Sequence, residues 1–213
     1  MQNQQVLIDS LPTGKLTADN YRLSESAMPE MGPGQVLIKT IAFAITAGTR
    51  AGLQGSASYA GAPEAGRVMN GTGVGEVVAS NVPEFSVGDH VTAATGWQAY
   101  SAQDAKLVTK IDPSHDPIHY LGPLGINGLT AYFGLNEVGQ AKAGETVMVS
   151  AAAGSVGAYG RTNGAYCGLP YCGCLRQRRK RPRTHRAIRF WQRGQLQRRE
   201  LSPEFERGDT QWC

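Results

Sequence analysis

Short stretches of alternating apolar and polar residues fill the first 120 positions of the chain, and this period of two predicts strands. One stretch runs from Gln35 to Phe43 after the turn Gly32-Pro33-Gly34. Others lie at 75–79 and 90–93, separated by loops that contain Gly, Pro and Asp. Short strands at this spacing are typical of a small β domain, so we expect residues 1–120 to form a mostly β unit.

The pattern changes after the Gly-rich stretch 121–128, because apolar residues at 129–138 recur with helical spacing. The run 146–151 is apolar and β-branched, as in a strand buried on both faces. It leads into Ala152-Ala153-Gly154-Ser155-Val156-Gly157. A strand, a small-residue turn and a helix in this order present backbone N–H groups to a dinucleotide pyrophosphate, although ordinary strand–helix turns use similar residues. Residues 121–159 thus predict the start of an α/β (Rossmann) dinucleotide-binding domain.

Charge and cysteine are distributed unevenly between the two ends of the chain. Residues 1–159 hold 8 Lys and Arg against 13 Asp and Glu, a net charge of −5. Residues 160–213 hold 13 against 4, a net charge of +9, and they contain all four cysteines. This split indicates that two different kinds of sequence meet near Tyr159.

Several stretches of the first part resemble one known family. They lie at 71–81, 87–91, 96–100, 128–134 and 149–157. All are similar to the zinc-free branch of the medium-chain dehydrogenase/reductase family, which contains prostaglandin and alkenal double-bond reductases. The resemblance implies a GroES-like β domain before the truncated Rossmann domain, and NADPH-dependent hydride transfer to the C=C bond of an α,β-unsaturated carbonyl. It also implies that the full-length protein can form a homodimer.

The resemblance also implies where small molecules bind. NADP would contact Asn127, Thr130 and the turn residues Ala152, Ala153, Gly154, Ser155, Val156 and Gly157. Near the substrate, the family's Asp-Pro-Tyr-Met-Arg stretch is replaced by Thr46-Ala47-Gly48-Thr49-Arg50, in which only Arg50 is retained. This departure leaves a quinone open as the substrate instead of an enone. Tyr59 could line the same pocket or lie in an exposed loop, and no catalytic residue is assigned.

Metal and membrane chemistry find little support in the sequence. Catalytic zinc needs about three protein ligands, whereas residues 1–159 lack cysteine and contain only His90, His115 and His119. No apolar run approaches the roughly 18 residues of a membrane span. We therefore expect a cytoplasmic protein without a metal site.

The basic tail, residues 160–213, has three interpretations. The cluster Arg176–Arg183 could bind nucleic acid through its charge, or one of its arginines could meet the 2′-phosphate of NADP. The second interpretation needs a preceding strand, but the segment 166–174 is interrupted by Gly and Pro. We favour the third interpretation, in which the tail is translated out of frame and is poorly ordered.

Codon arithmetic supports the frameshift hypothesis. Read one base forward, the codons of Gly160–Gly164 can encode valine-glycine-glutamine-methionine-alanine, which resembles the family's next segment. The same shift forces glycine at Trp191 and Trp212, again in family-like surroundings. A sheet that ended after strand 146–151 would leave that strand unpaired and the cofactor site incomplete. We therefore expect weak NADPH binding and an impaired or inactive reductase.

Resequencing the gene across the codon of Gly160 tests the frameshift directly. We expect one extra base at or near this codon, whose removal restores family-like sequence downstream. A gene from a second isolate that reads identically and in frame through Gly160 would exclude the hypothesis.

Overall fold

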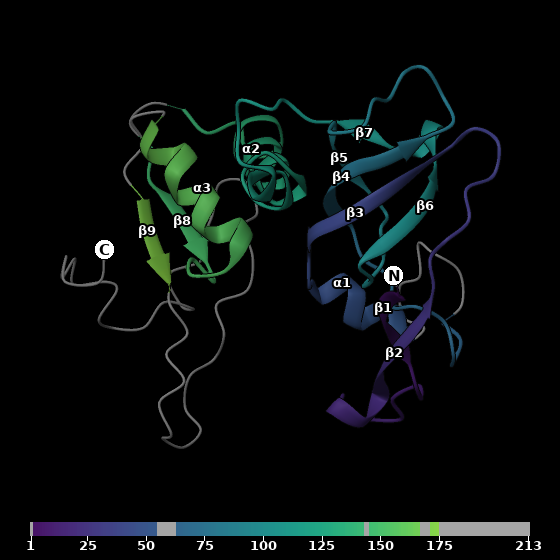
Figure 1. Ribbon diagram of the computed structural model, residues 1–213. Coiled ribbons are helices and arrows are strands. Elements are labelled where there is room, and N and C mark those ends of the chain that lie inside the picture. Colours follow the sequence, from purple (N-terminus) through teal and green to yellow (C-terminus); the bar gives the residue numbers. More distant parts are fainter. Residues whose placement is uncertain (1, 55–62, 143–144, 167–170, 175–213) are drawn as a thin grey trace. The chain divides into compact units, whose positions relative to one another are not determined.

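The computed structural model describes residues 2–54, 63–142, 145–166 and 171–174, and the chain divides into two compact units, Met1–Leu121 and Gly122–Cys213. The first unit is built mainly from strands, whereas helices and parallel strands make up the second (Figure 1). The predicted fold class, a mostly β domain followed by an α/β segment, is confirmed.

The first unit contains a five-stranded antiparallel sheet and a separate β-hairpin. The sheet order is β6-β3-β4-β5-β7, and the hairpin pairs β1 with β2. The strands are β1 (Gln2–Ile8), β2 (Tyr21–Ala27), β3 (Gln35–Phe43), β4 (Gly73–Ser80), β5 (His90–Ala93), β6 (Tyr100–Asp104) and β7 (Thr109–Lys110). The helices are α1 (Ala47–Leu53) and the 3-10 turns η1 (Ala18–Asn20), η2 (Ala105–Leu107) and η3 (Pro117–Leu121).

Strand β3 forms the centre of the sheet because its alternate side chains point into the core. Val36 and Ile38 are completely buried, and they pack with Val77 of β4 and Val91 of β5. Burial of each such side chain contributes about 1.5–3 kcal/mol to folding. The apolar alternation seen in the sequence is therefore the pattern that fixes which face of β3 is inward.

A second apolar cluster attaches the hairpin to the rest of the unit. Ile8 of β1, Leu53 of α1 and Met69 are buried together, with Trp97 packed against them. Backbone hydrogen bonds reinforce the contact, since the N–H of Val6 donates to Trp97 O at 2.9 Å and that of Met69 donates to Val6 O at 2.8 Å. The hairpin is thus held by both packing and main-chain pairing.

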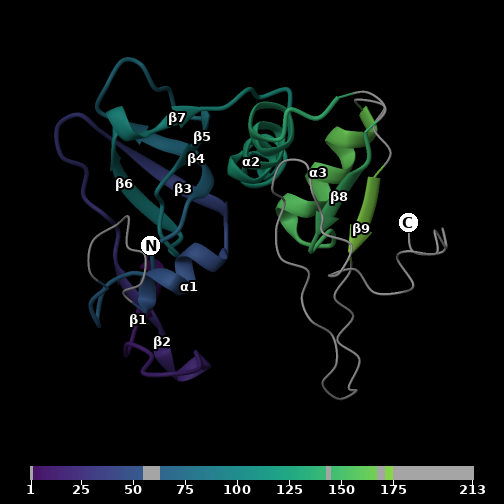
Figure 2. The ribbon, with the colours of Figure 1, turned by 180° about the vertical axis from the view of Figure 1, so that it is seen from behind.

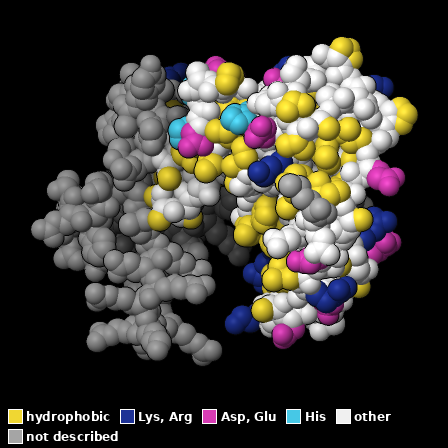
Figure 3. Space-filling model, viewed as in Figure 1, with side chains coloured by type: hydrophobic (Ala, Val, Ile, Leu, Met, Phe, Trp, Pro, Cys, Tyr) yellow, Lys and Arg dark blue, Asp and Glu magenta, His cyan; other side chains and the backbone are white. Residues whose placement is uncertain are grey.

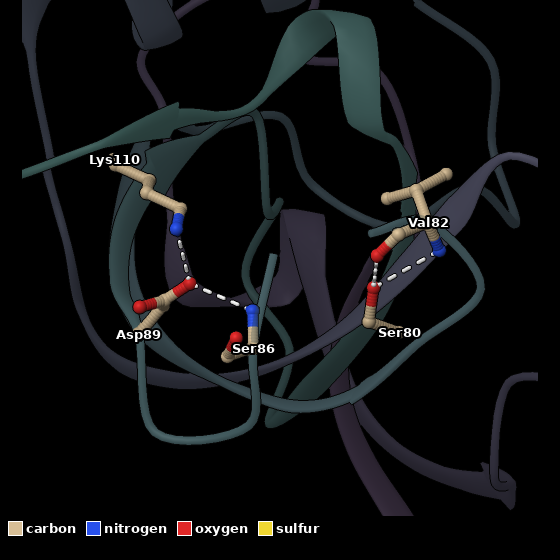
Figure 4. A network of polar contacts seen from close by, with 5 residues as sticks. All are labelled: Ser80, Val82, Ser86, Asp89 and Lys110. Atoms are coloured by element: carbon tan, nitrogen blue, oxygen red, sulfur yellow. Dashed lines mark hydrogen bonds and ion pairs between the residues drawn. The ribbon is translucent and has the colours of Figure 1, made fainter. Parts of the chain in front are cut away.

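Two polar contacts stabilise the turns at one end of the sheet (Figure 4). The Asp89 carboxylate accepts hydrogen bonds from Lys110 Nζ at 2.7 Å and from the N–H of Ser86 at 2.8 Å. Ser80 Oγ donates to Val82 O at 2.8 Å and accepts from its N–H at 3.1 Å. The bonds from Lys110 and Ser86 hold the pKa of Asp89 below its ordinary value of 3.8.

The second unit alternates helices with a parallel pair of strands. It contains α2 (Ile126–Phe133), the π-helix η4 (Gly134–Val138), β8 (Val147–Ser150), α3 (Ser155–Tyr166) and β9 (Tyr171–Cys174). Strands β8 and β9 are parallel, with Val147 opposite Tyr171 and Ser150 opposite Cys174. Helix α3 packs on both strands and lies beside them in the front and back views (Figures 1 and 2).

Two expectations for this unit are corrected. Residues 160–166 continue α3, and β8 has a parallel partner in β9, although Pro170 precedes β9 and Gly173 lies within it. Such residues weaken a strand, but pairing with the apolar β8 and packing under α3 outweigh local propensity. The predicted helix over 129–138 begins earlier, at Ile126, and becomes a π-helix at Gly134. The cluster Arg176–Arg183 lies outside the described residues.

Replacing Asp89 by Asn should destabilise the first unit in a pH-dependent way. Because the pair with Lys110 is only partly buried, we expect a loss of about 0.5–1 kcal/mol at pH 7. A carboxylate with a lowered pKa contributes its full stability above the unfolded value of 3.8 and loses it as the pH falls through the lower folded pKa. The difference between wild type and Asp89→Asn in urea unfolding should therefore shrink towards zero below pH 3.8.

The exposed pair of Glu64 with Arg67 supplies the control for that experiment. Glu64→Gln should leave the free energy of unfolding almost unchanged at both pH values, since exposed ion pairs contribute little. An equal loss in the two variants, or a loss in Asp89→Asn that persists at acid pH, would contradict the assignment.

Candidate dinucleotide-binding site

The connection between β8 and α3 is a tight turn. Ala151 follows the strand with a φ of 51°, in the left-handed region, where a non-glycine residue carries strain. The N–H of Gly154 donates to Ala151 O at 2.8 Å, and α3 begins at the next residue, Ser155. The strand therefore turns directly into the helix within four residues.

Glycine at position 157 allows the first turn of α3 to pack against the end of β8. A Cβ built on Gly157 would come within 2.5 Å of Ala151 O and 2.9 Å of Ala152 Cα. At Gly154 the nearest atom would be Ala151 O at 3.2 Å. Ala153, Gly154 and Ser155 are themselves exposed. The turn therefore offers backbone to solvent without side chains that obstruct its approach.

The electrostatics of this turn favour an anion. Helix α3 has 12 residues, and its first turn contains no acidic side chain. The unpaired N–H groups and the positive end of the helix dipole both point out of the helix N-terminus, where a phosphate can accept their hydrogen bonds. Small exposed residues and free backbone donors are the features that a pyrophosphate requires at this place.

The other two predicted cofactor residues lie on α2, which packs on α3. Asn127 is half-buried and already engaged in a polar interaction. Thr130 is exposed, and its hydroxyl donates to Ile126 O at 2.6 Å. The structure thus gathers the six turn residues in one place and puts Asn127 and Thr130 on the neighbouring helix of the same unit.

The predicted substrate residues belong to the first unit. Arg50 is exposed on α1, whose N-terminus is closed by reciprocal hydrogen bonds between Thr46 and Thr49. Burial raises the pKa of Tyr21, and the nearby positive charge of Arg50 partly offsets this rise. Arg50 therefore lies close to an aromatic side chain of β2. Tyr59 lies outside the described residues.

Sequence reasoning missed a stack of three aromatic rings in this unit. The ring of Trp97 lies between those of Tyr21 and Phe43, with centroids 5.7 Å and 5.3 Å apart and planes inclined by 21° and 16°. These residues come from the start of β2, the end of β3 and the loop before β6. The Gly-Trp-Gln stretch was visible in the sequence, but nothing there indicated which rings would meet it.

The described residues contain no group of three His, Cys, Asp or Glu side chains able to hold a metal ion. Within the same ranges, no helix is long and apolar enough to cross a membrane. A cavity of about 420 Å³ is present in the first unit, lined by Pro33, Gly34, Val82, Glu84, Phe85, Asp104, Ala105 and Lys106. None of the predicted site residues lines it.

Residues 4–111 match the family model described as the N-terminal domain of oxidoreductase. The NADPH-dependent curcumin reductase of Escherichia coli is 38% identical over 158 residues, which are 74% of this chain and 46% of that protein. The NADP(+)-dependent 2-alkenal reductase of Nicotiana tabacum is 34% identical and is matched over 48% of its length, by 74% of this chain. The chain therefore spans about half the length of the curated relatives it matches.

Solved structures agree with these sequence matches. CurA of Vibrio vulnificus, solved in complex with NADPH, superposes with a TM-score of 0.72 at 37% identity. The superposition covers 80% of this chain and 51% of that one. The likeness therefore extends beyond residues 4–111 into the second unit.

Two glycines of α3 test the packing of the helix against the turn. Gly157→Ala should destabilise the second unit by about 1–3 kcal/mol, because its Cβ would collide with the backbone of Ala151 and Ala152. Gly160→Ala, where nothing lies within 4 Å, should be neutral or stabilise by up to about 1 kcal/mol. Hydrogen exchange at the amides of β8 measures both effects, and equal protection in the two variants would contradict the packing.

Proposed function

We propose that this chain, which belongs to the zinc-free branch of the medium-chain dehydrogenase/reductase family, derives from an NADPH-dependent reductase of the C=C bond of α,β-unsaturated carbonyls. The observation that carries the proposal is the turn at Ala152–Gly157, where small residues expose the N-terminus of α3. The names of the relatives support the cofactor and the substrate class, since they include NADPH-dependent reductases of curcumin and of alkenals.

The residues present fit the diphosphate of NADPH. A Cβ at Gly157 would fill space that the backbone of the turn occupies, so glycine there keeps the helix N-terminus close to the strand end. Backbone N–H groups of Ala153 to Val156 would hold the diphosphate oxygens, with Asn127 and Thr130 contributing from α2. Once bound, NADPH supplies the hydride that an enone accepts at its β-carbon.

The chain's own residues would hold the substrate oxygen. Reduction of an enone places negative charge on the carbonyl oxygen as the β-carbon gains hydride, and a proton then completes the α-carbon. Arg50 is an exposed cation that could stabilise this charge, and Tyr59 is the second substrate candidate. A quinone develops the same oxyanion on hydride transfer, so quinone reduction stays a second substrate class.

We expect this version of the chain to be impaired. The described part of the second unit has one parallel pair of strands, β8 and β9, whereas a nicotinamide needs a wide sheet to bind against. The side chains of β8 are only half-buried or exposed, in keeping with incomplete cover. In this proposal the cofactor retains its diphosphate contacts but lacks most of the surface that would fix the nicotinamide.

Titration of the isotope-labelled chain with NADPH tests both parts of the proposal by NMR. We expect amide shifts at 152–157 only at millimolar NADPH, and stabilisation below about 0.4 kcal/mol at 1 mM, which corresponds to a Kd above 1 mM. No shift at these amides would refute the site. Measurable consumption of NADPH with an enone would refute the impairment.

The charge split favours one alternative, a β-domain protein whose Arg-rich tail binds nucleic acid. The relevant residues, 175–213, lie outside the described ranges. A variant that ends at Cys174 retains α3 and β9 and removes most of the charge. Salt-dependent retention on nucleic acid that disappears in this variant would support the alternative, and equal retention of both chains would exclude it.

A further inference from the structure

The aromatic stack of Tyr21, Trp97 and Phe43 ends at Phe43. Among the described residues, Phe43 has a ring contact with Trp97 alone, on one of its two faces. Phe43 is the last residue of β3 and is only half-buried. The stack therefore presents a terminal ring at the point where the strand leaves the sheet.

The ring behind Phe43 is fixed in position. The backbone of Trp97 is held on both sides, since its N–H donates to Met69 O at 2.9 Å and its carbonyl accepts from Val6 N–H at 2.9 Å. The edge of the indole lies against Gly71, where any Cβ would approach its Cδ1 and Nε1 atoms to 2.8 Å. A ring clamped in this way loses little conformational entropy when another flat group extends the stack, so Phe43 is preorganised for stacking.

The surface beside Phe43 is apolar and exposed. Ile41 and Ile45, two positions before and after Phe43, are 48% and 73% exposed. Hydrophobic side chains gather on this face of the first unit over β3, β4 and α1 (Figure 3). Exposed apolar surface of this kind marks a binding site more often than chance, and a flat ring edge suits an aromatic ligand.

The same stack leads to the predicted oxyanion partner. Helix α1 begins four residues after Phe43, and its Arg50 acts electrostatically on Tyr21, the ring at the other end of the stack. The stacking surface and the cation are therefore parts of one region of the first unit. A substrate that is both conjugated and aromatic could use the two together.

We propose that Phe43 stacks against an aryl group of the substrate and gives this chain a preference for aryl enones over alkyl enones. The inference rests on the proposed enone chemistry and specifies its substrate class. Stacking contributes beyond simple burial, so an aryl enone should bind about two- to tenfold more tightly than an alkyl enone with the same number of carbons.

Binding of two enones to the full chain tests this preference. Benzylideneacetone and an alkyl enone of equal carbon number are titrated without NADPH, and the side-chain N–H signal of Trp97 reports occupancy. We expect Phe43→Leu to abolish the preference by weakening the aryl enone while leaving the alkyl enone unchanged. Phe43→Tyr retains a ring and should retain the preference.

Phe85 provides the matched control, because it is a phenylalanine that packs against the other apolar cluster and lines the 420 Å³ cavity. Phe85→Leu should leave the preference intact. A preference lost in Phe85→Leu would place the aryl group in that cavity, and a preference retained in Phe43→Leu would show that Phe43 does not contact it. Either result overturns the proposal. If Phe43→Leu fails to fold, Phe43→Met offers a flexible side chain without a ring for the same comparison.

The outcome separates this inference from the proposed function. An aryl preference without NADPH-induced shifts at 152–157 leaves the substrate site standing and removes the reductase assignment. NADPH-induced shifts at those amides without an aryl preference remove the role of Phe43 alone.

Discussion

The contact between the Trp97 indole and Gly71 is the constraint on which the first unit depends. It lets one large ring reach the apolar cluster of Ile8 and Met69 while its backbone pairs with the β-hairpin. A side chain at position 71 would move the indole, and with it the hairpin and the floor under α1. Packing at this point therefore sets where Phe43 and Arg50 lie, although neither residue contacts Gly71 in sequence.

In the second unit a comparable constraint acts through Gly157. The close approach of α3 to Ala151 brings the helix N-terminus to the end of β8, which creates the anion site and also covers part of the strand. One helix on a parallel pair covers only one face, so β8 stays half-buried. The local geometry that binds phosphate is thus present in a unit with little other stabilisation, because the turn needs few residues and the sheet needs many.

Local patterns predicted the elements whose signals are local. Alternation located β3 and β5, and the small-residue turn located the start of α3, because each depends on neighbours in the sequence. Strand β9 was missed because pairing with β8, 24 residues earlier at the register of Val147 with Tyr171, outweighs the Gly and Pro that argue against it. The aromatic stack was missed for the same reason, since Tyr21 and Trp97 meet only after the sheet and hairpin have formed. The frameshift hypothesis stays a prediction, because the residues that distinguish it lie mostly outside the described ranges.

The departure at Thr46–Arg50 gains a physical meaning from the stack. Gly48 stands where the resembling reductases carry a tyrosine, and its backbone is free of neighbours apart from Thr46 Oγ1 at 3.5 Å from a built Cβ. A ring is nevertheless available five residues earlier, at Phe43, and it is backed by a fixed indole. An aromatic surface can therefore be supplied to the same region from the end of β3 rather than from α1. Because β3 is anchored by completely buried side chains, a ring at its end is held more rigidly than one on a short surface helix.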